Sequence, residues 1–581
     1  MARATDPSRS EESVKAHIFG FIETKGISSK NAKTFFRGRI STALNTFSRI
    51  LAFTSARVYA LSALSFGLLT LFLHLADYYF RSDPHVELST LIIGAAFAAL
   101  SIPLFLSDKP ICMALQSFKL TDFVIFEFFS VNRMQSVEHQ GKGLPPIAGV
   151  ILGALPAVAG YFTSVPVAVI AVASLIFCGI AMASPELPYI FSLLIFPFLP
   201  LIPYSSLILC ALVGITLLSF GRKVILGKRV YAFEIYDILV VLAVFAVIIT
   251  GVILGGSNST PIALYTAVFV LSYIPAANIA VNRRLCDCVA SAIVVASVPV
   301  SIFAIIDGIV NLSTGNGLCA KGWFASPELL CVYLTVASLF SLTLSVERKK
   351  PANRILYSLS FYVSFLAIIL TGYFAFIIAL LIGILSFMII RSSGVPKILL
   401  IFSLALPFAV FLLPASVLSA ISDALSISPT LNEVYSSVLS SAQLFGDNLF
   451  GIGANGYEAG EYPMFNTYFG IFCRFGIGVM VITVLFLLLR LRHHTLYGRF
   501  FQSSVVGFYV NASSLAVILM LVYGTYTDIF SDVNNVYFFI SLLAMGAATL
   551  RISRKEREDR LSYYKDLRSF DSSVIDVTIV N

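Results

Sequence analysis

The chain has 581 residues, of which 58% are apolar and only 12% are charged, and its mean hydropathy is +0.90. This composition is far from that of a soluble domain and is typical of a protein that crosses a membrane many times. The net charge of +8 does not indicate nucleic-acid binding, because the cations lie in short connections and tails, where membrane topology explains them.

Residues 1–57 form a polar, basic segment ahead of the first apolar run. Within it, residues 35–57 space apolar side chains between arginines. This pattern predicts either an amphipathic helix on the inner leaflet or a plain positively charged anchor. No cleavable signal peptide is expected, because the first long apolar run starts near Val58.

Residues 58–550 form the expected membrane domain, since a helix needs about 20 apolar residues to cross the hydrocarbon core. We predict an all-α, polytopic transmembrane bundle of about 14–16 spans. The sixteen candidate spans lie near 58–80, 88–106, 144–162, 165–184, 188–203, 204–220, 235–254, 261–281, 287–309, 328–346, 355–371, 373–390, 398–420, 465–489, 504–525 and 535–550. Prolines between 144 and 203 leave kinked or re-entrant segments open there.

The cations fix the predicted orientation. All Lys and Arg residues except Arg81, Lys321 and Arg474 fall in the tails or on alternate connections. Cationic loops stay on the cytoplasmic side, so we expect both termini inside and a multi-pass protein of the plasma membrane. The charged tail 551–581 predicts a short helix followed by disorder, and it could dock a cytoplasmic partner.

The outer side has one long connection, residues 421–464. Its periodic apolar residues predict one or two short surface helices, and residues 446–456 are rich in glycine. A glycine-rich run is most often a set of turns, but its exposed N–H groups can also cradle an anion.

Only two cations are well placed for an anionic ligand on the outer side. Lys321 lies in a small polar loop beside Trp323, the only tryptophan. Arg474 lies inside a span, where an unpaired charge would cost several kcal/mol. It therefore either pairs with Asp307 or another acid inside a span, or faces a substrate cavity. Lys321 is either a substrate-binding cation or a solvated loop charge.

No metal or cofactor is expected. The eight cysteines lie mostly in or beside apolar segments, where a thiol behaves as a small hydrophobe. Cys286 and Cys288 lack the second pair that a zinc site needs, and the spacing indicates no disulfide framework.

Residues 235–490 resemble the O-antigen ligase and polysaccharide polymerase superfamily in the order of their features. An outer loop, 317–327, is placed like the family's Arg-bearing segment, and Thr371-Gly372 stands where the family has a Ser-Arg-Gly turn. The glycine-rich run resembles the family's proline-glycine turn. Phe465-Asn466, nine residues and then Gly476 match the family's His-Asn motif in spacing.

The resemblance implies a bacterial inner-membrane protein that polymerises or ligates a glycan carried on undecaprenyl diphosphate at the outer leaflet. The family's His assists proton removal from the acceptor hydroxyl, and its arginines neutralise the diphosphate. Here Phe465 cannot accept a proton, and Thr371-Gly372 supplies no cation. Either Lys321 and Arg474 hold the diphosphate, or the fold is kept without the reaction.

The divergent-enzyme hypothesis needs a new base, and Glu458 or Glu461 is adequate when burial raises its pKa. Asn466 and Trp323 complete the predicted substrate-binding set. A transporter or flippase is the main alternative, and a scaffolding protein is the third. The expected partners are a lipid-linked oligosaccharide and membrane lipids.

Overall fold

Helices make up most of the residues that the computed structural model describes, and these residues form two compact units. The described residues are 54–80, 88–106, 109–111, 113, 144–227, 229–254, 256–281, 283–314, 318–347, 351–393, 436, 439, 449–453, 466–501, 506–525 and 527–578. Among them there is no β-strand beyond one isolated bridge, which joins Ser55 to Pro110. The all-α prediction is confirmed.

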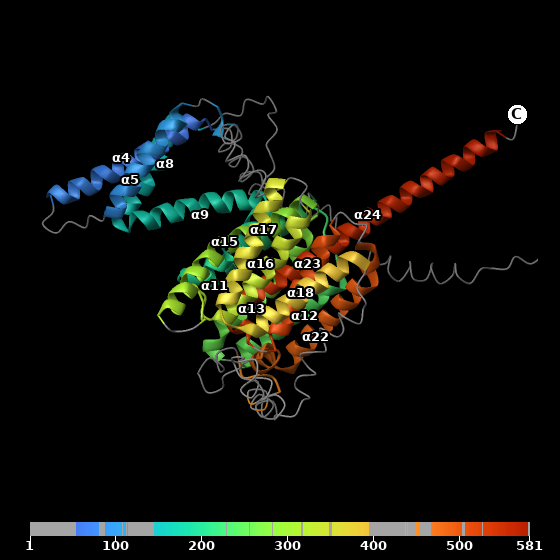
Figure 1. Cartoon of the computed structure of the whole chain (residues 1–581). Coiled ribbons are helices and arrows are strands. Elements are labelled where there is room, and N and C mark those ends of the chain that lie inside the picture. The colour runs from blue at the N-terminus through green and yellow to red at the C-terminus, as the bar shows by residue number, and fades with distance from the viewer. Residues whose placement is uncertain are drawn as a thin grey trace, which may run out of the picture. The chain divides into compact units, whose positions relative to one another are not determined.

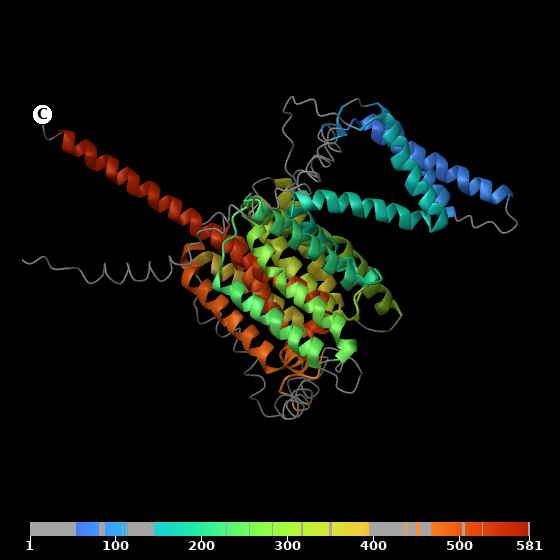
Figure 2. The same ribbon diagram turned by 180° about the vertical axis from the view of Figure 1, so that it is seen from behind.

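The first unit contains the described residues up to Leu187 together with Leu218–Tyr231. Its helices are α4 (Ala56–Phe80), α5 (Leu88–Phe105), α8 (Pro146–Phe162) and α9 (Val165–Ala183). Helices α4, α5 and α8 pack side by side in Figure 1 and Figure 2. Gly149 and Gly153 make the α4–α8 contact possible, since a Cβ on Gly153 would lie 2.1 Å from the Ser62 carbonyl oxygen.

A polar cluster is buried between α4 and α8. Thr70, His74 and Asp77 lie one turn apart on the buried face of α4. The Tyr161 hydroxyl of α8 donates to Asp77 Oδ1 at 3.1 Å, and its ring meets His74 edge-on at 5.6 Å between centroids. The apolar helices therefore bury their acid and base together.

An ion-pair cluster joins two connections that the sequence places on the cytoplasmic side. Glu186 accepts from Arg229 at 2.6 Å and from Lys223 at 3.5 Å, and the Ser184 hydroxyl donates to it at 2.8 Å. Burial raises the pKa of Glu186, but the two cations outweigh it and lower the pKa below its usual value. The connection at 185–187 has no cation of its own, and its glutamate is neutralised by two cations from the next predicted cytoplasmic loop.

The second unit contains Pro188–Leu217 and the described residues from Ala232 onward. Its α-helices are α12 (Ile235–Ile248), α13 (Gly256–Leu271), α14 (Tyr273–Ile279), α15 (Arg283–Ser313), α16 (Pro327–Glu347), α17 (Pro351–Leu370), α18 (Phe374–Ser393), α22 (Thr467–Phe501), α23 (Gly507–Tyr523) and α24 (Asn534–Thr578), and the two units share α10 (Glu186–Ile195) and α11 (Ser205–Ile225). Short irregular turns are η2 (Phe196–Leu201), η3 (Ile249–Leu254) and η4 (Ile529–Ser531).

Helix α16 lies at the centre of this unit, and almost nine-tenths of the residues in its most apolar stretch are buried. Tyr333 of α16 packs against Phe538 of α24 and Phe196 of η2, with ring centroids 5.6 and 6.0 Å apart. These aromatic rings join segments far apart in the sequence and form the core that holds the surrounding helices in place.

Connections that the sequence predicts on one side also meet at one end of the second unit. At the outer end, so named from that prediction, the Ala320 amide donates to the Leu370 carbonyl at 3.1 Å, and the Thr467 amide donates to that of Gly524 at 2.7 Å. At the inner end, Arg551 pairs with Glu234 at 3.1 Å. The alternation of loops derived from charge is thus consistent with the packing.

In the described part of the chain, eleven helices are long and apolar enough to cross a membrane, and four shorter apolar helices accompany them. Each falls on a predicted span. The span expected at 398–420, the segment 35–53 and most of the loop 421–464 lie outside the described residues.

The C-terminal tail differs from expectation. Instead of a short helix followed by disorder, α24 continues without a break to Thr578. Residues 554–560 are almost all good helix formers, and Glu556 precedes Arg560 by one turn, a spacing that supports a helix in water.

Candidate functional site

Helix α22 is broken at Gly476, where φ is 76° and ψ is 179°. The short segment Leu449–Gly453 crosses it there: the Ile452 amide donates to the Cys473 carbonyl at 2.7 Å, and the Ile477 amide donates to that of Leu449 at 3.0 Å. This backbone region is open almost only to glycine. The spacing motif that ends at Gly476 therefore marks a real structural feature, a broken membrane helix.

Arg474 lies just before this break and is only 6% exposed. Its guanidinium group forms an ion pair with Asp528 and donates to the Phe530 carbonyl at 2.9 Å. A charge buried at this depth needs such a partner. The partner is neither Asp307 nor another acid within a span, because Asp528 lies in the connection between α23 and α24; an ion pair forms, but not with the kind of acid that was expected.

Asp528 is held in turn by the connection between α23 and α24. Its carboxylate accepts from the Phe530 amide at 3.2 Å and is only 5% exposed. Burial raises the pKa of Asp528, and the neighbouring Arg474 opposes that rise without cancelling it. This residue was not singled out from the sequence. The signal that could have found it was the short apolar loop, which leaves an aspartate little room to reach water.

Asn466 and Thr467 attach the start of α22 to the same loop. Asn466 Oδ1 accepts from the Tyr468 amide at 2.9 Å and its Nδ2 donates to the Thr525 carbonyl at 3.4 Å. The Thr467 hydroxyl donates to the Thr527 carbonyl at 2.8 Å and accepts from the Ile529 amide at 2.9 Å. Asn466 thus caps α22, and the substrate-binding role predicted for it stays a prediction.

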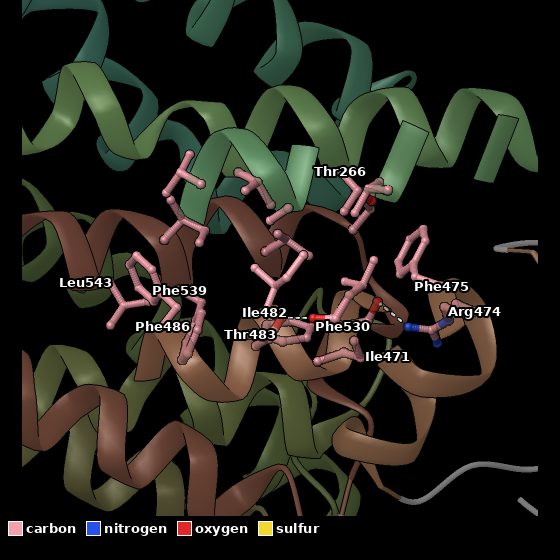
Figure 3. Close-up of a pocket in the computed structure, with 18 of the residues that line it drawn as sticks. Thr266, Ile471, Arg474, Phe475, Ile482, Thr483, Phe486, Phe530, Phe539 and Leu543 are labelled. Carbon is pink, nitrogen blue, oxygen red and sulfur yellow. Dashed lines mark hydrogen bonds between the residues drawn. The ribbon is translucent and has the colours of Figure 1, made fainter. Parts of the chain in front are cut away.

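An apolar cavity of about 100 Å³ runs along α22 inward from Arg474 (Figure 3). Its walls come from α12, α13, α22, η4 and α24. Thr266 and Thr483 line it, but each hydroxyl donates to a carbonyl of its own helix at 2.8 Å. Among the lining residues, Arg474 is the only ionisable one, and in Figure 3 it lies at the opposite end from Leu543.

The apolar lining of this cavity suits a hydrocarbon ligand. An unfilled apolar hollow of this size would cost on the order of 2 kcal/mol of packing free energy. Water gains little there, because it needs several polar partners. A hydrocarbon chain with an anionic head at Arg474 would fill the hollow and meet its one cation.

Three of the helices around the cavity are irregular. Helix α12 ends in the π-helical turn η3, α13 and α14 are separated at Ser272, and α22 is broken at Gly476. At the first of these, the Ser259 hydroxyl donates to the Gly251 carbonyl at 2.6 Å, so a side chain satisfies one of the displaced backbone groups. Irregular backbone within a membrane is typical of the walls of a binding cavity.

The second cation, Lys321, lies in a separate cluster. Asp307 Oδ2 accepts from the backbone amides of Lys321 and Gly322, each at 2.9 Å, and Asn311 Nδ2 donates to the Cys319 carbonyl at 2.9 Å. The Lys321 side chain is exposed. Arg474 and the Lys321 loop are thus held by different acids, Asp528 in the α23–α24 connection and Asp307 in α15.

Trp323 anchors that loop. Its indole N–H donates to the Pro197 carbonyl at 2.6 Å, and its ring packs against Phe303 and Phe198 at centroid distances of 4.9 and 5.7 Å. The ring is half-buried, so its contacts fix the loop and leave part of the indole exposed at the outer end.

The turn Thr371-Gly372 packs against the same loop. Gly372 has φ of 78°, and a Cβ there would lie 2.3 Å from the Leu318 carbonyl oxygen. The Thr371 hydroxyl lies 3.2 Å from Cys331 Sγ and donates to the Ile368 carbonyl at 2.6 Å. The turn therefore has a structural role and adds no cation.

The predicted bases Glu458 and Glu461 lie outside the described residues. In the part of the chain that the structure describes, no group of three or more His, Cys, Asp or Glu side chains could hold a metal ion.

Comparison with models of known protein families found no match, and no curated protein matched the chain.

Proposed function

We propose that this protein acts in the assembly of a cell-surface glycan and holds an undecaprenyl-diphosphate-linked saccharide at the outer leaflet of a bacterial plasma membrane. One observation supports this most directly: a buried arginine lies at one end of an apolar cavity inside a membrane bundle. The lipid carrier of such a saccharide has an anionic diphosphate head and an apolar tail, which match the arginine and the cavity. The class of reaction is proposed from the order of sequence motifs over residues 235–490, which resembles that of the polymerase and ligase superfamily.

The Arg474–Asp528 pair defines how a diphosphate would bind. An anionic head must share the guanidinium with Asp528 or displace the carboxylate from it. The phosphate gains a charge-assisted contact in a low-dielectric site, which is stronger than the same contact in water. Protonation of the displaced Asp528 would ease this exchange, because its pKa is already raised.

The reaction we propose is transfer of the glycan from the diphosphate to an acceptor hydroxyl. The hydroxyl oxygen attacks sugar C1, the C1–O bond to the diphosphate breaks, and the hydroxyl proton goes to a base, for which Glu458 or Glu461 is proposed. Arg474, with Lys321 at the outer surface, neutralises the departing diphosphate. A relative that keeps the fold and the lipid site without transfer is the alternative within this proposal.

A lipid transporter is the second candidate, and a specific observation favours it. Three helices that line the cavity, α12, α13 and α22, are each interrupted or end in irregular backbone, as broken helices do in carriers. In that case Arg474 would contact the head of a lipid on its way across the membrane, and no sugar bond would break.

The test is the lipid-linked glycan that accumulates in a deletion strain complemented with variants. Lys321→Ala and Arg474→Lys should abolish the polymer or glycolipid product at normal membrane levels, and the unused donor should be exposed at the outer leaflet. Leu488→Ala, at a half-exposed position of α22, is the matched control and should keep full product. Full product from the Lys321→Ala and Arg474→Lys double variant contradicts the proposal. Accumulation on the inner leaflet assigns the transporter function instead.

A further inference from the structure

One of the residues that line the cavity near its inner end, Phe486, belongs to a group of three aromatic rings whose other two members pack behind it. Phe486 of α22 meets Tyr236 of α12 edge-on at 5.7 Å between centroids and meets Tyr273 of α14 at 5.3 Å. We call these three residues the aromatic floor. All three are buried, with Tyr273 only 1% exposed.

The floor is held from below. The Tyr236 hydroxyl donates to the Leu489 carbonyl at 3.1 Å, and the Arg490 guanidinium lies 5.4 Å from the Tyr236 ring centroid. These contacts bind α12 to the next turn of α22, directly beyond Phe486. A ring held in place on both sides closes a passage more firmly than a flexible aliphatic side chain would.

The length of the cavity follows from α22. Val479 and Phe486 both line it in the unbroken part of α22, and at the rise of an α-helix their positions are roughly 10 Å apart along the axis. Apart from Arg474 and Ser531, the lining residues are apolar or are threonines whose hydroxyls bond to their own helix. The space is thus a slot for one hydrocarbon chain of limited length.

We infer that the aromatic floor closes the inner end of this slot and so fixes how much of a lipid tail the protein contacts. The inference rests on the proposed lipid site and specifies its ligand as a single-chain tail with an anionic head at Arg474. A tail that reaches Phe486 fills the slot. Any further length stays in the bilayer, which is as apolar as the protein and gives no added affinity.

Chain-length dependence of binding tests this inference. Geranyl, farnesyl, geranylgeranyl and undecaprenyl monophosphates would be bound to the full-length protein in lipid nanodiscs and measured by native mass spectrometry. Affinity should rise several-fold with length and then reach a plateau once the tail reaches the floor. Phe486→Ala should move the plateau to a longer chain, and Phe486→Leu should move it less.

Two further variants keep the test decisive. Val479→Phe narrows the slot nearer Arg474 and should move the plateau to a shorter chain. Leu485→Ala, whose side chain is 46% exposed on the same helix, is the control and should leave the plateau in place. If Phe486→Ala does not fold, opposite shifts from Phe486→Leu and Val479→Phe carry the same conclusion.

The outcomes separate this inference from the proposed function. A plateau that neither Phe486 nor Val479 moves, while Arg474→Lys still weakens head binding, overturns the aromatic floor alone. Transfer of the lipid to the inner leaflet also overturns it, because the floor would then be open. Binding that depends on neither the tail nor Arg474 overturns the proposed lipid site as well.

Discussion

The two outer cations differ in how the fold treats them, although the sequence presents them alike. Asp307 is bound to the backbone amides of Lys321 and Gly322 and leaves the lysine side chain exposed. Asp528 is bound to the Arg474 guanidinium itself, inside the protein and beside an apolar cavity. An aspartate thus shapes a loop in one cluster and neutralises a charge in the other. Burying the charge of Arg474 therefore costs more free energy than placing the exposed charge of Lys321. The Arg474 cluster is the better candidate for a lipid site.

The largest expected effect comes from breaking the buried pair. Arg474→Ala leaves Asp528 as a buried, uncompensated carboxylate, so we expect a loss of about 3–5 kcal/mol in the free energy of unfolding. The double substitution Arg474→Met with Asp528→Leu should recover most of that loss. Thermal unfolding in detergent measures both. A single substitution without effect would show that the pair is not buried in the folded protein.

Two glycines on α22 give the next contrast. Gly476 has φ of 76°, and a Cβ there would lie 2.4 Å from the Phe450 carbonyl carbon, whereas a Cβ on Gly478 would meet no atom within 4 Å. Gly476→Ala should therefore cost at least about 1–3 kcal/mol, the strain of a backbone region open almost only to glycine. Gly478→Ala should be neutral or stabilise by about 0.5–1 kcal/mol. Equal effects of the two substitutions on thermal unfolding would rule out the break in α22.

The sequence predicted the membrane bundle well because hydropathy and loop charge are local signals. It also placed Arg474 in a span and left two alternatives for it, an acidic partner or a substrate cavity. It could not choose Asp528 over Asp307, because that choice depends on how the α23–α24 connection folds against the start of α22. For the same reason it could not show that the Asn466 side chain caps α22, and the substrate-binding role of Asn466 stays a prediction.

The Asp307 cluster provides a smaller effect with its own reporter. Asp307→Ala removes the acceptor of two backbone amides, which should cost about 1–3 kcal/mol and loosen the loop around Trp323. Because Trp323 is the only tryptophan, its fluorescence reports on this loop alone, and a red shift is expected. Lys321→Ala keeps both amide bonds and should change stability by less than about 0.5 kcal/mol. An unchanged emission maximum in Asp307→Ala would contradict the assigned role of Asp307.

The smallest expected effect is a pH dependence of head binding. Burial holds the pKa of Asp528 above its usual value of 3.8, so the carboxylate takes up a proton at a higher pH than an ordinary aspartate. Neutral Asp528 no longer competes for Arg474, and binding of an alkyl sulfonate, whose charge is fixed, should strengthen as pH falls through that raised pKa. Asp528→Asn should remove this dependence.

Asp532 lies in the same α23–α24 connection, and burial raises its pKa too. Its carboxylate accepts a hydrogen bond from the Asn534 amide at 3.0 Å. Asp532→Asn should therefore keep the pH dependence. If Asp532→Asn removed the pH dependence and Asp528→Asn kept it, the acid that competes with the ligand for Arg474 would be Asp532, which contradicts the assignment to Asp528.

The central claim is that Arg474 holds the anionic head of a membrane lipid whose tail lies in the adjoining cavity. Its most direct test is an experimental structure of the protein in lipid nanodiscs with added undecaprenyl diphosphate. We predict phosphate oxygens within hydrogen-bonding distance of the Arg474 guanidinium and tail density beside Val479. An intact Arg474–Asp528 pair, with the lipid bound elsewhere and this cavity empty, would contradict the account.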